Sequence, residues 1–235
     1  SVWDAAHPAP KAADPQFEKD LLKWFTRDAQ NQIALAASTK DGMESTLRPA
    51  LKIIIGRDYN DVGAMDWNMS AKVDKGGYSE ITGTLINQKH QEEVALLWLA
   101  PKRWNGTAVL WLDDCGKSAA QDPAALRLVD SGVAVFGADL LRQSPTPVTQ
   151  TPVVANPREF AGYTHGYNHS LFAQRTHDVL SILRFLHNSA PKTDSTPTRV
   201  LVAAWGSTGP IALSARAIAG TAIDKLAVDT KGFRF

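Results

Sequence analysis

The amino-acid sequence predicts a mostly parallel α/β domain, doubly wound as a three-layer sandwich. Four short apolar runs with the character of buried strands follow one another along the second part of the chain, and helical patterns separate them. Two strand-like segments joined by a polar stretch precede these runs, as in an antiparallel hairpin. Strands that alternate with helices form parallel pairs through right-handed crossovers. With 235 residues and 44% apolar content, the chain is large enough to bury a substantial core.

The first part of the chain has a different pattern. Apolar residues at helical spacing predict a helix from about residue 15 into the 30s. Residues 40–75 are rich in Gly, Asp and Asn with weak periodicity, and within them only 51–55 are expected to form a short strand or buried segment. We therefore assign 1–76 to a helical and irregular N-terminal extension and 77–235 to the α/β core.

The elements of the core follow in order along the chain. We expect the hairpin over 78–86 and 93–99. A helix capped by Asn168 or Ser170 precedes the third apolar run, and a helix over 209–219, stopped by Gly220, follows it. The four parallel strands are expected at 107–112, 132–136, 199–204 and 223–228.

Composition excludes several classes of partner. Lys and Arg number 25 against 24 Asp and Glu, so no broad field attracts nucleic acid or an acidic membrane surface. No apolar run approaches the roughly 20 residues that span a bilayer, and we expect a soluble protein. Cys115 is the only cysteine, which rules out an intrachain disulfide, and we expect it to be a small buried residue.

Candidate site residues follow the strands, because ligands bind beyond the carboxyl ends of the strands in an open parallel sheet. The segment 199–209 has the pattern of a strand, a Gly-flanked turn and a helix, which is where a nucleophile elbow presents a serine. Ser207 is the candidate. The Pro-rich stretch 143–157 is expected to be a surface loop beside these strand ends.

The chain resembles the α/β-hydrolase superfamily over roughly residues 78–235, and within it the acetyl xylan esterase and deacetylase branch. The resemblance rests on the hairpin and on three segments that follow strands: Asp113-Asp114-Cys115-Gly116, Asp139 with Arg142-Gln143, and Trp205-Gly206-Ser207-Thr208-Gly209. The pair Arg142-Gln143 matches an Arg-Gly-Gln motif of those deacetylases with the Gly missing.

This resemblance implies a carboxylic ester hydrolase that removes acetyl groups from a small-molecule or polysaccharide ester through an acyl-enzyme. Ser207 would be the nucleophile, and the oxyanion hole would use the backbone N–H of Thr208 with one near Asp114 or Cys115. Trp205 is expected beside the site. The resemblance implies no cofactor and no metal, and it favours a secreted or periplasmic location.

Two registers of the turn stay open in the sequence. The family motif is Gly-x-Ser-x-Gly, and with Ser207 as its serine the first position is the bulky Trp205. Alignment by the strand instead puts Ala204 first and Gly206 at the apex, where glycine accepts a strained turn conformation. In that register the chain is an inactive module that binds a carbohydrate or a partner domain. A serine that precedes a helix, such as Ser207, is also commonly a cap that accepts a backbone N–H.

The general base is missing from its expected place. The superfamily orders its triad as serine, acid, histidine, but all six histidines precede Ser207. We therefore expect an incomplete fold whose C-terminal strands belong to a remaining segment or a second chain that supplies the base. Asp229, at the end of the last strand, is expected to be an ordinary turn residue.

Other polar motifs are given structural roles. His165 and His169 lack a Cys or acidic partner at ligand spacing, so we expect surface or capping roles for them. His177 and Asp178 are adjacent within a helix and point in different directions, which favours surface salt bridges. Gly116-Lys117-Ser118 is not a phosphate loop, because Trp111 stands where that motif requires Gly.

Overall fold

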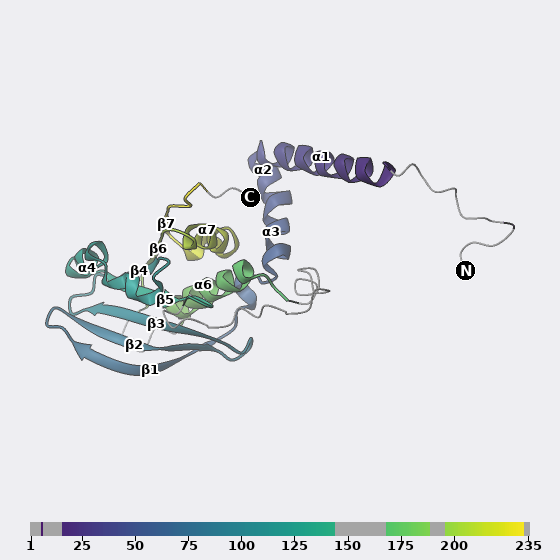
Figure 1. Ribbon diagram of the computed structural model, residues 1–235. Coiled ribbons are helices and arrows are strands. Elements are labelled where there is room, and N and C mark those ends of the chain that lie inside the picture. Colours follow the sequence, from purple (N-terminus) through teal and green to yellow (C-terminus); the bar gives the residue numbers. More distant parts are fainter. Residues whose placement is uncertain (1–5, 7–15, 144–167, 189–195, 233–235) are drawn as a thin grey trace. The chain divides into compact units, whose positions relative to one another are not determined.

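The computed structural model of the chain describes residue 6 and residues 16–143, 168–188 and 196–232 (Figure 1). The chain divides into two compact units, 1–50 and 51–235. No helix in these described ranges is long and apolar enough to cross a lipid bilayer.

The first unit is helical. It contains α1 (Phe17–Ala37), the single turn α2 (Lys40–Gly42) and a π-helical turn (Met43–Leu47). The Thr39 hydroxyl accepts the Gly42 N–H at 3.0 Å and thereby caps α2. The helix predicted into the 30s is confirmed. The next helix, α3 (Arg48–Ile55), crosses the boundary between the units, so residues 51–55 are helical and the strand expected there is wrong.

The second unit is built on a mixed sheet, in which the described residues form seven strands in the order β1-β2-β3-β5-β4-β6-β7. Strands β1, β2, β3 and β5 pair antiparallel, while β5, β4, β6 and β7 pair parallel. The bounds are β1 Met65–Asp74, β2 Tyr78–Asn87, β3 Glu92–Pro101, β4 Thr107–Leu112, β5 Ala134–Asp139, β6 Arg199–Ala204 and β7 Lys225–Val228. The predicted hairpin and the four parallel strands are confirmed.

Strand β1 corrects the sequence interpretation, which treated 40–75 as irregular. It pairs with β2 along its length, with a bulge between Met69 and Ala71. Its sequence alternates apolar and polar residues from Met65 to Asp74, which is the pattern of a half-buried strand, so the signal was present and the sequence interpretation missed it. Most of its side chains are nevertheless exposed. Residues 51–76 therefore lie in the same compact unit as the core. The boundary between the units follows Ala50, whereas the sequence interpretation placed it after residue 76.

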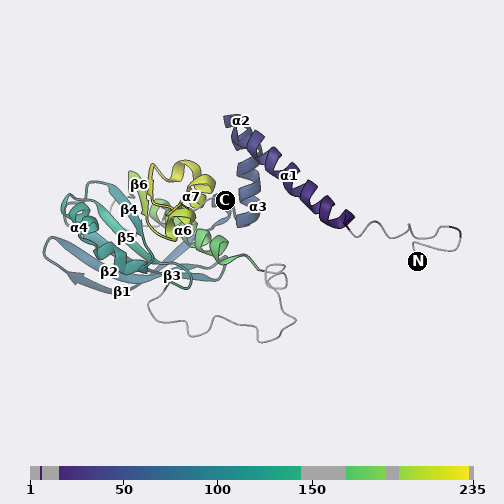
Figure 2. The same cartoon turned by 45° about the horizontal axis from the view of Figure 1, so that its top comes forward.

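Helices cover both faces of the sheet. On one face α6 (Leu171–Asn188) and α7 (Thr208–Ala219) lie side by side and enclose the main core with Leu110, Phe136 and Val202 of the sheet (Figures 1 and 2). On the other face α4 (Pro123–Asp130) and a 3-10 segment (Gly116–Gln121) pack on Leu97, Leu99 and Val135. This three-layer arrangement places the ends of β4, β5 and β6 along one edge of the unit.

Candidate functional site

The turn after β6 resolves the two registers of the sequence motif. Gly206 has a φ of +64°, in the left-handed region, whereas Ser207 has φ −68° and ψ −14° and is already helical. The Trp205 N–H donates to the Leu112 carbonyl at 3.1 Å, which ties the turn to the end of β4. Gly206 is therefore the apex of the turn, and Ser207 is the N-cap of α7.

The side chain of Asp114 fills the space next to this apex. The Ser207 N–H donates to Asp114 Oδ1 at 3.0 Å, and the Ser207 hydroxyl donates to the same oxygen. A Cβ added to Gly206 would come within 2.9 Å of Asp114 Cγ. Any side chain at the apex would therefore collide with the carboxylate that is already there.

The charge of Asp114 is held in place by its partners. Hydrogen bonds from the Ser207 hydroxyl and N–H, together with the charges of Lys231 and Arg175, lower the pKa of Asp114 below its usual value. The Lys231 ammonium lies 3.8 Å from Asp114 Oδ2. The carboxylate is thus ionised at neutral pH and is a weak general base toward the Ser207 hydroxyl.

The backbone donors expected in an oxyanion hole are already engaged. The Thr208 N–H donates to the Trp205 carbonyl at 3.2 Å and Thr208 is fully buried. The Cys115 N–H donates to Asp113 Oδ1 at 3.1 Å. With Gly206 at the apex, the oxyanion donor is the Ser207 N–H, and Asp114 occupies it.

Cys115 differs from its expected role as a buried residue. Its thiol is free and exposed. The hydrogen bond and the charge of Asp113 raise the pKa of the Cys115 thiol. A raised pKa disfavours the nucleophilic thiolate.

Arg142 and Gln143 form a turn after β5. The Gln143 N–H donates to the Leu140 carbonyl at 2.8 Å, and Arg142 has a φ of +60°. The Arg175 guanidinium donates to the Arg142 carbonyl at 3.4 Å. A Cβ on Gly116 would approach the Gln143 carbonyl oxygen at 3.4 Å, so this turn lies beside the loop after β4. The rest of the predicted loop 143–157 is outside the described residues.

Two pockets open at these strand ends. One, of about 520 Å³, is lined by Asp114, Gly206, Ser207, Phe172, Pro210 and residues 230–232. The other, of about 560 Å³, lies next to the indoles of Trp111 and Trp205, whose ring centroids are 4.3 Å apart. Its polar lining consists of Asp113, Cys115, Ser118, Gln121 and Asp122. Trp205 thus lies beside the candidate site.

A buried polar cluster near the start of α6 corrects the surface role expected for His177 and Asp178. His177 is 1% exposed and donates from Nε2 to the Ile55 carbonyl at 2.7 Å, while Asp178 is 5% exposed and accepts the Leu141 N–H at 2.7 Å. Burial lowers the pKa of His177 to about 4 and raises the pKa of Asp178 to about 7. The positions of His177 and Asp178 in the helix pattern did not predict that both are buried, because α6 is buried on more than one side.

The remaining candidates have structural surroundings. His169 packs edge-on against His177 with ring centroids 5.2 Å apart, and His165 lies outside the described residues. Asp229 Oδ1 accepts the Lys231 N–H at 2.8 Å, which is the turn role expected for it. Within the described ranges, no group of three or more His, Cys, Asp or Glu is placed to hold a metal ion.

Comparison with solved structures identifies the fold. The chain superposes on a Bacteroides fragilis protein provisionally described as an acetyl xylan esterase, with a TM-score of 0.57, 14% identity and 77% of this chain covered. It superposes on acetyl xylan esterase 1 from Thermoanaerobacterium sp. (TM-score 0.53, 13% identity, 77% covered) and on a glucuronoyl esterase from Solibacter usitatus (0.51, 13%, 80%).

The chain has the α/β-hydrolase fold. The match spans 50%, 57% and 58% of these three esterases, so the hydrolase-fold chain corresponds to between half and three-fifths of their length. No protein-family model matches the sequence, and no curated protein matches it. The fold class and the structural resemblance predicted from the sequence are confirmed.

Proposed function

We propose that this hydrolase-fold chain binds a carbohydrate ester at the ends of its parallel strands and does not form an acyl-enzyme through Ser207. One observation carries the proposal: Gly206 is at the apex of the turn, and the Asp114 carboxylate occupies the Ser207 N–H. Acyl transfer requires a nucleophile at the apex, a base within reach and free donors for the oxyanion. The described part of the site instead presents a glycine and a fixed anion.

The carbohydrate preference rests on the pocket beside Trp111 and Trp205. Indole faces pack well against the C–H faces of a pyranose ring, and the pocket adds carboxylate, amide and hydroxyl groups that match sugar hydroxyls. The names of the superposed proteins refer to acetyl xylan and glucuronoyl esters, which are also carbohydrate esters. Fold and lining therefore favour the same ligand class.

Titration calorimetry with acetylated and deacetylated xylo-oligosaccharides tests this binding function. We expect the wild-type chain to bind. Trp205→Ala should weaken binding by about tenfold, because the sugar ring loses its contact with the indole face, and a buried aromatic contact is of this order. Trp205→Phe should retain part of the affinity. Trp24→Ala, on α1, is the matched control, because its indole is exposed and is not part of the pocket lining. Absence of wild-type binding, or equal affinities for Trp205→Ala and Trp24→Ala, would contradict the proposal.

A second candidate function is the carboxylic ester hydrolase implied by the resemblance, with acetyl xylan esterase-like deacetylation. Two observations favour it: the superposed proteins are esterases, and the exposed Ser207 hydroxyl lines a pocket of about 520 Å³. Asp114 would then have to release the Ser207 N–H, and a remaining segment or a second chain would supply the base. Hydrolysis of acetylated xylo-oligosaccharides that falls at least a thousandfold in Ser207→Ala would establish this function.

A further inference from the structure

A separate cavity of about 460 Å³ lies at the other end of the sheet. It is bordered by Ala108 and Ala134, at the starts of β4 and β5, whereas the candidate site follows the ends of these strands. Its indole and phenyl walls belong to the sheet face that also carries α6 and α7. The candidate site uses none of these residues, and the size is typical of small-molecule sites.

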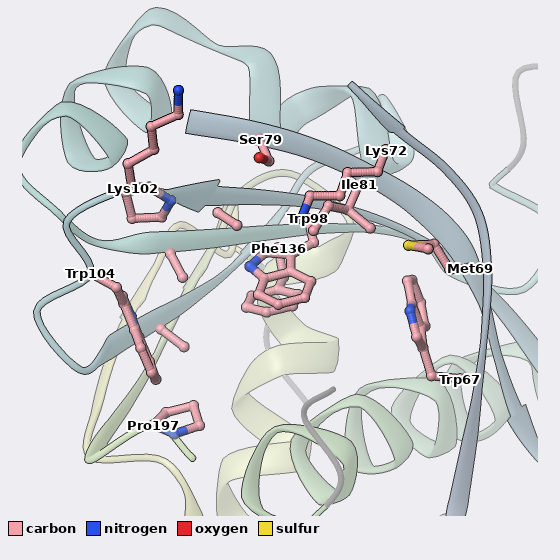
Figure 3. Close-up of a pocket in the computed structure, with 14 residues that line it drawn as sticks. Trp67, Met69, Lys72, Ser79, Ile81, Trp98, Lys102, Trp104, Phe136 and Pro197 are labelled. Carbon is pink, nitrogen blue, oxygen red and sulfur yellow. The ribbon is translucent and has the colours of Figure 1, made fainter. Parts of the chain in front are cut away.

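The walls of the cavity are aromatic. Figure 3 shows Trp67 and Trp104 on opposite sides, with Trp98 and Phe136 between them. The rings of Trp98 and Phe136 are stacked, with centroids 5.3 Å apart and an interplanar angle of 13°. Three indoles and a phenyl ring thus surround a space that suits a flat apolar body.

The polar groups of the cavity are few, and they favour an anion. Lys72 and Lys102 line it. Lys102 donates to Asp74 at 3.0 Å, whereas Lys72 forms no salt bridge with any described residue, although its charge also acts on Asp74 and contributes to lowering the pKa of that carboxyl. Two ammonium groups and one carboxylate leave a net positive rim. The wall also contains an unmet donor, because Trp98 Nε1 is buried without an acceptor among the described residues.

We propose that this cavity binds an aromatic carboxylate. The flat body of the ligand lies between Trp67 and Trp104 against the Trp98 ring, and its carboxylate faces the Lys72 ammonium. A neutral aromatic compound would gain the same apolar contacts but not the charge, and a polysaccharide would leave its hydroxyls unmet against these apolar walls. The proposal concerns a different surface from the strand-end site and does not depend on the function proposed there.

Calorimetry with 2-naphthoate, and with 2-naphthalenemethanol as the neutral comparator, tests the proposal on the full chain. We expect one binding site, with 2-naphthoate bound more tightly than the alcohol. Lys72→Gln should weaken naphthoate binding by about twofold to fivefold, as for an exposed charge pair, and leave the alcohol unchanged. Lys225→Gln, on β7 at the far edge of the sheet, is the matched control and should change neither affinity.

A second variant fills the cavity. Ala100→Phe places a ring in the space that Ala100 borders and should abolish binding of both compounds, with circular dichroism and thermal unfolding confirming the fold. If that variant unfolds, the Lys72→Gln comparison decides. Lack of naphthoate binding at millimolar concentration would overturn the proposal. Unchanged naphthoate affinity in Lys72→Gln would also overturn it. A third contradicting result would be a dimer, seen by light scattering, that forms through this face and that naphthoate does not dissociate.

Discussion

Asp114 accepts two hydrogen bonds from Ser207 in the turn after β6, one from the backbone N–H and one from the hydroxyl, and so engages both groups that acyl transfer would use. The sequence marked both residues as site candidates because each follows a strand, and the structure places those two strands, β4 and β6, side by side. The sequence could not predict the roles of Asp114 and Ser207. Whether Ser207 or Gly206 forms the apex depends on a backbone angle, and whether a backbone donor is free depends on which side chain reaches it.

Crowding at the apex predicts a measurable coupling between Gly206 and Asp114. Gly206→Ala should lower the free energy of unfolding by about 1–3 kcal/mol, because a Cβ is strained at a φ of +64° and meets the Asp114 carboxylate. In an Asp114→Ala background the same substitution should cost about 1 kcal/mol less, since the collision is relieved. Urea unfolding of the four chains measures this cycle, and strictly additive effects would refute the contact.

The buried pair His177 and Asp178 predicts an unusual pH dependence of stability. Between about pH 4 and 6.5 the unfolded chain carries a proton on His177 and none on Asp178, whereas the folded chain carries one on Asp178 and none on His177. The proton counts are equal, so the contributions of the two groups cancel. Above pH 6.5 only the Asp178 contribution remains, and stability falls as pH rises through about 7.

Asp178→Asn keeps an acceptor for the Leu141 N–H and removes the pH-dependent contribution of Asp178 to stability. The contribution of His177, whose pKa is depressed by burial, is then unopposed, and stability should rise by about 3 kcal/mol between pH 4 and 6.5. Urea unfolding at the two pH values measures this rise. Asp20→Asn, on the exposed part of α1, is the control that should keep the wild-type profile. A flat profile in Asp178→Asn would show that His177 is not buried in its neutral form.

The strands and helices divide into those that the sequence pattern specifies and those that packing specifies. Strands β4, β5 and β6 are buried apolar runs, and such runs are identifiable without a partner. Strand β1 alternates apolar and polar residues, a strand signal that the sequence interpretation missed, and it pairs with β2 although most of its side chains are exposed. The run Ile53-Ile54-Ile55 has high β propensity, yet it closes α3 with only Ile55 buried, so tertiary context overrides local preference.

The start of α7 is pressed against the loop after β7. A Cβ on Gly209 would lie 2.9 Å from the Asp229 carbonyl carbon and 3.3 Å from Thr230 Cα. Gly209→Ala should therefore destabilise the chain by about 1–2 kcal/mol, although alanine is the better helix former. Gly77→Ala is the matched control, because nothing lies within 4 Å of its Cβ and its φ is not positive. Thermal unfolding compares the two, and equal melting temperatures would show that the close approach is not present in solution.

For the molecule as a whole, the alternation of strands and helices was sufficient to predict a mostly parallel α/β fold, and the resemblance of the segments after the strands implied the α/β-hydrolase type. Superposition on three solved structures confirms that fold. That fold carries many chemistries, so function depends on the site. Of the predicted site residues, the structure brings Asp114, Trp205 and Ser207 together, while the oxyanion donors assigned to Thr208 and Cys115 are bonded elsewhere. Those bonds depend on side-chain reach, which residue spacing does not encode.

The central claim is that Ser207, the N-cap residue of α7, donates its hydroxyl to Asp114 and is not an activated nucleophile. Exposure of the full chain to a fluorophosphonate serine-hydrolase probe, followed by intact mass and peptide mapping, tests this most directly, with Ser207→Ala and an active serine esterase as controls. We predict no adduct on Ser207, because among the described residues the only base that contacts its hydroxyl is the weakly basic Asp114 carboxylate, and the oxyanion donor is occupied. A stoichiometric adduct on Ser207 that disappears in Ser207→Ala would contradict the account and establish an acyl-enzyme hydrolase.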